Sequence, residues 1–252
     1  MKRPLLGGLT LASLAACQSL GVEVDAGYTQ VAVSGDIALA DGTQGTGGAP
    51  QQDMESAFGI GEQQGSPYLR ASCRADHLSF AASGFMFEES GRGVLEANFG
   101  GLTAATPVTS DLEFACVKLS GTYDFDLGFM TLAPGLAMDV IDLEFRVREL
   151  TLGNGEEIDE LVGVPMVFLR ASGDVGVASL IGEIGYMEAE VDSSGGSYLD
   201  AEVTLRVSPL RSVNFFGGYR FIDFDAEGDT GTDSFSVDLQ VQGWVLGGGI
   251  SF

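Results

Sequence analysis

The sequence predicts an all-β protein, an antiparallel up-and-down transmembrane β-barrel of about ten strands, with eight or twelve strands as alternatives. Apolar residues recur at every second position along most of the 252-residue chain, which is the spacing of a strand with one oily face. Mean hydropathy is high at +0.20, yet no apolar run after the N-terminus is long enough for a membrane helix. Connections between the predicted strands alternate between short and long. A Gly-rich soluble β-sandwich is the alternative fold.

Residues 1–16 have the features of an export signal peptide, with two cations followed by a short apolar segment. The segment that ends at Cys17 reads Leu-Ala-Ala-Cys and resembles the lipobox of bacterial lipoproteins. That resemblance implies lipidation of Cys17 and, because Gln18 rather than Asp follows, delivery to the outer membrane. The alternative is a plain signal peptide in which Cys17 is incidental. The mature domain is expected to span residues 17–252.

Nine alternating segments precede the C-terminal one, which runs to residue 252. They lie at residues 22–35, 67–75, 78–88, 112–125, 129–147, 161–171, 175–191, 199–208 and 213–224. A short helical turn is expected near residues 52–58.

The connections support a barrel more than a sandwich. Short connections lie at residues 76–77, 126–128, 172–174 and 209–212, and long or acidic ones at 36–66, 89–111, 148–160, 192–197 and 225–233. Membrane barrels have short periplasmic turns and longer external loops. Both termini are therefore expected on the periplasmic side. The acidic segments are expected to be external loops.

The last nine residues alternate in a way that a closing strand requires. The alternating set is Trp244, Leu246, Gly248, Ile250 and Phe252. This pattern, together with residues 217–224, resembles the last hairpin of Gram-negative outer-membrane β-barrel proteins. The resemblance implies that the set is the signal read by the barrel-insertion machinery, and that the chain contacts outer-membrane lipid and lipopolysaccharide.

A second apolar set precedes it in the opposite phase. Its members are Phe235, Val237, Leu239 and Val241. A regular strand cannot turn both sets outward, so we predict a bulge near Gln242-Gly243. If the strand is instead regular, one apolar set must face the lumen.

The strand phases place eleven charged residues inside the barrel. They are Glu23, Asp25, Arg70, Arg74, Lys118, Asp139, Glu183, Asp200, Glu202, Arg206 and Arg220. Facing lipid, each Arg or Lys would cost up to about 2–4 kcal/mol at the membrane midplane. A barrel of ten strands is too narrow for a wide channel. We expect a lumen mostly plugged by ion pairs, with a narrow pore lined by the same residues as the alternative.

No catalytic set is apparent. The enzymes among small outer-membrane barrels, which this chain resembles in architecture, mostly pair a His with Ser, Asp or Glu. The one His, His77, lies in a predicted periplasmic turn. No Gly-x-Ser-x-Gly motif, Cys/His metal spacing or phosphate-binding loop is present. Cys73 is expected to face outward and Cys116 inward, so we expect no disulfide between them. We predict no enzymatic activity and no cofactor.

The net charge of −24 argues against a nucleic-acid partner. Asp225, Glu227 and Asp229 alternate as in a flexible calcium loop, but the spacing of an EF-hand is missing. They are a calcium-binding candidate, and a solvated acidic rim that faces lipopolysaccharide is the alternative. The predicted function is structural or surface-interacting. The alternatives are a narrow small-solute channel and a soluble periplasmic β-rich lipoprotein.

Overall fold

The computed structural model describes residues 20–40, 50–151, 153–191, 194–230 and 233–252. The predicted signal peptide at residues 1–16 and the lipidation candidate Cys17 lie outside these ranges. No helix among the described residues is long and apolar enough to cross a membrane.

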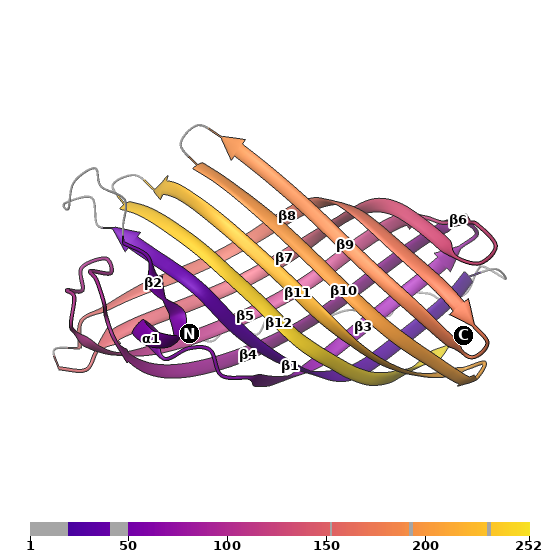
Figure 1. The fold of residues 1–252 in the computed structure, drawn as a ribbon, viewed down its shortest axis with the longest axis horizontal. Helices are drawn as coiled ribbons and strands as arrows, with labels where there is room; N and C mark the ends of the chain where they lie inside the picture. The colour runs from indigo at the N-terminus through magenta and orange to yellow at the C-terminus, as the bar shows by residue number, and fades with distance from the viewer. Residues whose placement is uncertain (1–19, 41–49, 152, 192–193, 231–232) are drawn as a thin grey trace.

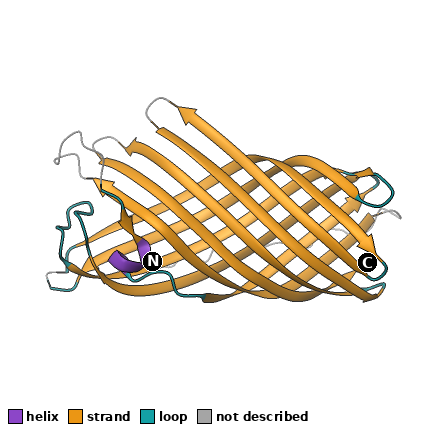
Figure 2. Ribbon diagram, in the orientation of Figure 1, coloured by secondary structure: helices purple, strands orange, loops and turns teal. Residues whose placement is uncertain are grey.

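Ten long antiparallel strands form a closed barrel within these ranges (Figures 1 and 2). They are β1 (Leu20–Ala40), β3 (Gln64–Ala75), β4 (Leu78–Val94), β5 (Pro107–Tyr123), β7 (Thr131–Glu149), β8 (Gly155–Val175), β9 (Ala178–Val191), β10 (Ser194–Leu210), β11 (Val213–Thr230) and β12 (Asp233–Ser251). Each pairs with the next along the chain, and β12 pairs with β1 to close the wall. Two backbone hydrogen bonds between Val22 and Phe252 complete that seam. The prediction of a ten-stranded up-and-down barrel is confirmed.

The two ends of the barrel differ, and we name them by their connections. The turn end has the short connections, the start of β1 and the end of β12. The loop end has the long connections (Figure 1). At the loop end, two short elements, β2 (Gln52–Asp53) and α1 (Met54–Phe58), pack against β1 and β4. Asp53 caps α1 by accepting from the Ser56 N–H, and Gly59 ends it in the left-handed conformation at φ 71°. The predicted helical turn is confirmed.

Several strands, among them β8, β10 and β11, are longer than the sequence pattern indicated, whereas β9 is shorter. A tilted strand crosses a bilayer with about 9–11 residues, whereas β8 has 21 and β12 has 19. The acidic stretch at residues 156–160 lies in β8, and Asp225 and Glu227 lie in β11. The expectation that these carboxylates belong to long external loops was therefore wrong: they extend the strands at the loop end. The short β6 (Phe125–Asp126) pairs with β7 at the turn end.

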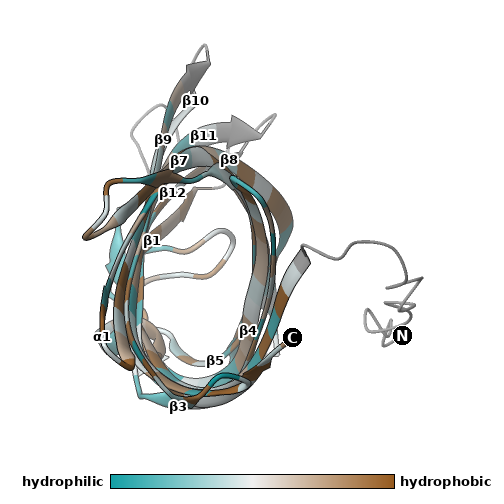
Figure 3. Cartoon of the chain, turned by 90° about the vertical axis from the view of Figure 1, so that its right-hand side faces the viewer, coloured by the Kyte–Doolittle hydropathy of each residue, from teal (hydrophilic) through white to brown (hydrophobic). Residues whose placement is uncertain are grey.

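The polarity of the two faces of the wall reverses along each strand. Toward the loop end the inward positions become apolar and the outward positions become polar. In β1, Val24 and Tyr28 are exposed near the turn end, while Asp25 is buried inside. Farther along, Val33 is buried inside, and Asp36 takes the outward position. Successive strand residues point to opposite faces. The same alternate positions therefore face outward along the whole strand, and what changes is the environment that each face meets. Figure 3 shows the alternation of hydrophilic and hydrophobic positions along the strands.

β12 makes the same exchange without a bulge. Its register with β1 and β11 runs unbroken through Gly243. Val237, Leu239 and Val241 are buried, and Trp244, Leu246 and Ile250 are exposed. The predicted bulge near Gln242-Gly243 was wrong, because the first apolar set faces the lumen. The register shift in this region of the sheet lies instead between Val207 and Leu210 of β10.

The wall is not fully paired at the loop end. β8 pairs with β7 as far as Gly155, but its pairing with β9 stops at Val167. The outer parts of β9 and β10 lean away from the barrel in the end-on view (Figure 3).

Candidate functional site: the barrel lumen

The lumen contains three layers: an apolar layer at the loop end, an ion-pair cluster in the middle, and a polar cavity at the turn end. The apolar layer brings wall residues together with connecting segments. Phe58 of α1 contacts the rings of Phe99 and Phe145 edge-on, with ring centroids 5.2 Å apart in both cases. Gly91 and Gly93 of β4 let the backbone of α1 approach closely, because a Cβ at either would collide with a carbonyl of that segment. Phe58, Phe99 and Phe145 are all fully buried in this layer.

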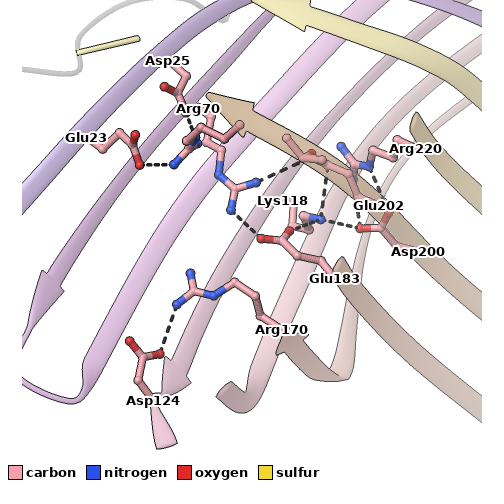
Figure 4. Close-up of polar contacts among 12 residues, drawn as sticks. Glu23, Asp25, Arg70, Lys118, Asp124, Arg170, Glu183, Asp200, Glu202 and Arg220 are labelled. Carbon is pink, nitrogen blue, oxygen red and sulfur yellow. Dashed lines mark hydrogen bonds and ion pairs between the residues drawn. The ribbon is translucent and has the colours of Figure 1, made fainter. Parts of the chain in front are cut away.

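The central cluster consists of three cations and four carboxylates from six strands: Arg70, Lys118, Arg220, Asp139, Glu183, Asp200 and Glu202 (Figure 4). Lys118 Nζ lies 3.1 Å from Glu183 Oε2 and 3.0 Å from Asp200 Oδ2. Arg220 Nε lies 3.0 Å from Asp200 Oδ1. All but Arg70 are buried. Each cation of the cluster lies within ion-pair distance of at least two carboxylates.

Arg70 and Arg220 connect the cluster to its surroundings. Arg70 donates to Glu183, and its Nη1 lies 3.6 Å from Glu202 Oε1. Arg220 Nη2 lies 3.4 Å from Asp139 Oδ2, and Tyr198 donates to the same oxygen. The Arg220 guanidinium also lies 5.3 Å from the ring centroid of Phe85, a cation–π distance.

Two further ion-pair groups lie toward the turn end. Arg206 donates to Glu23, and its Nη2 lies 2.7 Å from Asp25 Oδ2. Arg74 and Arg170 share one carboxylate, that of Asp124: Arg74 Nε lies 2.9 Å from Oδ2, and Arg170 Nη2 lies 3.1 Å from Oδ1. Of these residues, Glu23, Arg74, Arg170 and Arg206 line a cavity of about 330 Å³.

The structure places all eleven charges named from the sequence on the inner face of the wall, in these groups. Sequence reasoning missed Arg170 and Asp124. A signal was available for both. Arg170 stands between the outward Leu169 and Ala171, and Asp124 continues the inward phase of Lys118.

The cysteines and the histidine are in ordinary structural surroundings. Cys116 is buried in the lumen, Cys73 is partly buried, and both are free thiols. His77 lies in the turn between β3 and β4, where its ring stacks on Tyr123 with centroids 5.6 Å apart. Among the described residues, no group of three or more His, Cys, Asp or Glu side chains is arranged to hold a metal ion.

The outer face of the barrel has two zones. The apolar belt covers the half nearer the turn end, and its members are Val24, Tyr28, Leu69, Phe80, Val117, Leu119, Leu136, Met138, Val167, Leu169, Leu180, Ile184, Val203, Leu205, Phe215, Trp244, Leu246 and Ile250. Tyr219 packs against Trp244 with ring centroids 5.0 Å apart. Amphipathic aromatic rings are common where a membrane protein meets the headgroups. The belt therefore has the composition of a lipid-facing surface.

The acidic crown is the outward face beyond the belt, toward the loop end. Its carboxylates are Asp36, Glu88, Asp111, Glu113, Asp142, Glu144, Glu157, Asp159, Glu188, Asp223, Asp225, Glu227 and Asp238, none of them buried. Arg146 lies among three of them, 3.6 Å from Glu113 and 3.1 Å from Glu157.

Asp36, Asp238 and Asp225 stand directly opposite one another on β1, β12 and β11. The pKa of Asp238 is raised above its ordinary value by partial burial and then by the charges of Asp225, Asp223 and Asp36. The crown thus keeps an excess of carboxylates even though Arg146 pairs with three of them.

Solved structures share this architecture. The structure of the outer membrane protease OmpT from Escherichia coli aligns with a TM-score of 0.57 at 10% identity, covering 92% of this chain and 96% of that one. The chain has the fold of the Gram-negative outer-membrane β-barrel proteins. The translocator domain of the autotransporter NalP from Neisseria meningitidis (TM-score 0.44, 15% identity, 90% of this chain and 88% of that one) and OprG from Pseudomonas aeruginosa (0.41, 10%, 92% and 95%) align less well. No family model and no curated protein sequence matches the chain.

The barrel shares its fold with a protease, but at 10% identity the likeness is one of fold alone. Its activity must be argued from its own residues. In the described part of the lumen, most charged side chains form ion pairs, whereas Glu89 accepts from backbone N–H groups and Asp174 accepts from Ser179. The single His lies at the turn end, far in the fold from the acidic crown.

Proposed function

We propose that this chain is a non-enzymatic outer-membrane barrel with a plugged lumen, and that it acts at the cell surface through its acidic crown. The plug supports the first part. Lys118 lies among Glu183, Asp200 and Glu202 at the centre of the barrel, and the apolar layer around Phe58 and Phe145 lies beyond it. Water and ions would have to cross both layers to pass through.

Planar-bilayer recording tests the plug. We expect the purified barrel to give no stable unitary conductance. The variants Glu202→Gln and Arg206→Gln serve as the internal comparison, because both alter the lumen. Stable unitary steps in the wild type, with an ion selectivity that changes in these variants, would establish the narrow-channel alternative and overturn the plugged barrel.

The orientation proposed for the barrel puts the turn end in the periplasm and the acidic crown outside the cell. Short turns at the periplasmic side are the rule in this architecture. Single cysteines introduced at Arg211, in a turn, and at Thr103, in a loop, test it in a Cys73→Ser, Cys116→Ser background. An impermeant maleimide on intact cells should label position 103 and spare position 211. The reverse pattern would invert the proposed orientation.

The partners proposed for the surface follow from its two zones. The apolar belt would contact outer-membrane lipid, and the crown would lie next to lipopolysaccharide. Because both the crown and lipopolysaccharide phosphates are anionic, divalent cations would be needed between them. Asp225 and Glu227, the described members of the calcium candidate, belong to this crown; the side chain of Asp229 lies outside the described residues.

The remaining proposals concern the N-terminus and the soluble alternative. Mass analysis of the wild type against Cys17→Ala tests lipidation, since only a lipidated Cys17 adds the mass of acyl chains. The exposed apolar belt favours membrane insertion over a soluble lipoprotein. Extraction that requires detergent is expected; release into buffer without detergent would exclude the membrane-inserted form.

A further inference from the structure

The cavity at the turn end is distinct from the plug above it. It is lined by four guanidinium groups, those of Arg70, Arg74, Arg170 and Arg206, and by two carboxylates, Glu23 and Asp174. Serine hydroxyls supply much of the remaining lining: Ser72, Ser79, Ser172, Ser179 and Ser251. Guanidinium groups together with hydroxyl donors are the groups that recognise oxyanions.

Arg74 and Arg170 have unused donors, and the Arg206 Nε is also unpaired but fully buried. Both contacts of Arg74 use its Nε, which reaches Asp124 and Ser79. Arg170 uses only Nη2, also toward Asp124. The other nitrogens of both groups have no acceptor among the described residues. Asp124 is the one carboxylate within ion-pair distance of either Arg74 or Arg170 among the described residues, so two guanidiniums share a single carboxylate.

The other charges around the cavity are engaged. Arg206 is held by Glu23 and Asp25, and Arg70 by the central cluster. Asp174 accepts a hydrogen bond from Ser179. The unused donors that are not fully buried therefore lie at Arg74 and Arg170, whereas the carboxylate of Asp174 keeps its charge.

We propose that this cavity binds a small phosphate-type oxyanion, either inorganic phosphate or a phosphate monoester, between Arg74 and Arg170. The volume of about 330 Å³ is that of about ten water molecules at roughly 30 Å³ each. It accommodates a phosphate group with a small organic substituent. The central cluster closes the cavity on its inner side, so the oxyanion binds and does not pass through.

Calorimetric titration of the purified barrel, in a phosphate-free non-ionic detergent at constant ionic strength, tests the site. The probes are inorganic phosphate and glycerol 3-phosphate, with chloride as the reference anion. We expect saturable binding of at least one probe. Binding of both identifies the phosphate group as the determinant, and binding of glycerol 3-phosphate alone identifies monoesters as the ligands. Absence of saturable binding by either probe overturns the proposal.

Variants separate a binding role from a structural one. Arg74→Gln and Arg170→Gln should each weaken binding at least roughly tenfold, since each removes a charge-assisted contact. Asp124→Asn should strengthen binding several-fold, because it removes the carboxylate that competes for the same two guanidiniums. Arg92→Gln, on the outer face at the loop end, is the matched control and should bind as the wild type does.

Heat-modifiable gel mobility shows which variants fold. Should Arg170→Gln fail to fold, Arg74→Gln carries the test, because the Arg74 side chain is 56% exposed and its loss leaves the buried Asp124 still paired with Arg170. Binding that is equal in wild type, Arg74→Gln and Asp124→Asn would show that the oxyanion does not use this pair, and would overturn the assignment.

Discussion

Leu239 and Leu246 lie seven residues apart in β12 and face opposite sides of the barrel wall: Leu239 is 5% exposed and Leu246 is 64% exposed. Both positions are apolar for different reasons. Leu246 belongs to the apolar belt, and Leu239 belongs to the apolar layer that fills the lumen at the loop end. The barrel therefore has an apolar outer surface near its turn end, and near its loop end it resembles a soluble β-barrel with its own apolar core.

The boundary between the two zones can be located by adding one charge to the outer face of β12. Leu246→Lys should destabilise the barrel in lipid by about 2–4 kcal/mol, the cost of a lipid-facing Lys near the midplane. Gln240→Lys lies on the same face of the same strand but within the acidic crown, and should be neutral or slightly stabilising. Urea unfolding in lipid vesicles measures both. Equal losses in the two variants would place Gln240 inside the bilayer.

Gly243 is predicted to be essential for closing the seam between β1 and β12. A Cβ at this position would lie 2.1 Å from the Gln30 carbonyl oxygen, which is backbone and cannot move aside cheaply. Gly243→Ala should cost roughly 1–3 kcal/mol through overpacking. Gly182 of β9 is the matched control, because an added Cβ there meets nothing within 4 Å. Thermal unfolding followed by gel mobility distinguishes them, and a Gly243→Ala variant as stable as Gly182→Ala would contradict the close approach.

Lys118 is predicted to hold the central cluster together. Lys118→Met keeps most of the side-chain volume but leaves Glu183, Asp200 and Glu202 without their shared cation. Removal of one partner from a buried ion-pair cluster typically costs about 3–5 kcal/mol. Arg92→Met, an exposed position for which the described residues show no ion pair, should change stability little. Equilibrium unfolding of both variants makes the comparison, and wild-type stability in Lys118→Met would show that the cluster tolerates the loss.

Asp238 is predicted to make stability depend on pH. Its pKa is raised in the folded protein, so folding favours the protonated form. Stability is then greatest below the ordinary aspartate pKa and falls as pH rises through the raised value. Asp238→Asn should be more stable than the wild type at neutral pH by about 0.2–1 kcal/mol, the usual size of a cross-strand like-charge effect.

The difference for Asp238→Asn should vanish in acid. Glu227→Gln is the control, because Glu227 stands opposite Ser236 and Gly195 rather than a carboxylate. Unfolding measured across the acid to neutral range gives the profile. A gain in Asp238→Asn that is independent of pH would assign the effect to something other than repulsion among the aspartates.

The strand number and the inward charges follow from the sequence because period two is a local property. Arg206 and Glu202 alternate with Val203 and Leu205, and any regular strand must then turn the charges to one side. The alternation of short and long connections further indicates that consecutive strands are neighbours in the wall. These two signals were sufficient for the wall and for the residues of the central cluster.

The exchange of inside and outside could not be read from one strand. Val241 and Trp244 are both apolar, and no local pattern states which solvent each face meets. Where a strand leaves the bilayer, its residues keep alternating between the two faces, but the apolar side changes from the outer face to the inner one. In the sequence this change of apolar positions looks the same as a bulge. The pairing of Arg170 with Asp124 was equally hidden, because it depends on which residues meet across the lumen.

The hydrogen bonds between Val22 and Phe252 have a consequence for how the barrel assembles. They join residues at nearly the two ends of the described chain, so closure is the least local contact in the fold, and such contacts form late and slowly. Until β12 arrives, β1 and the growing last strand are open sheet edges that can pair with other chains. A ribosome-bound or partly exported chain cannot satisfy either edge, and its safe delivery depends on holding both edges apart until the final strand is available.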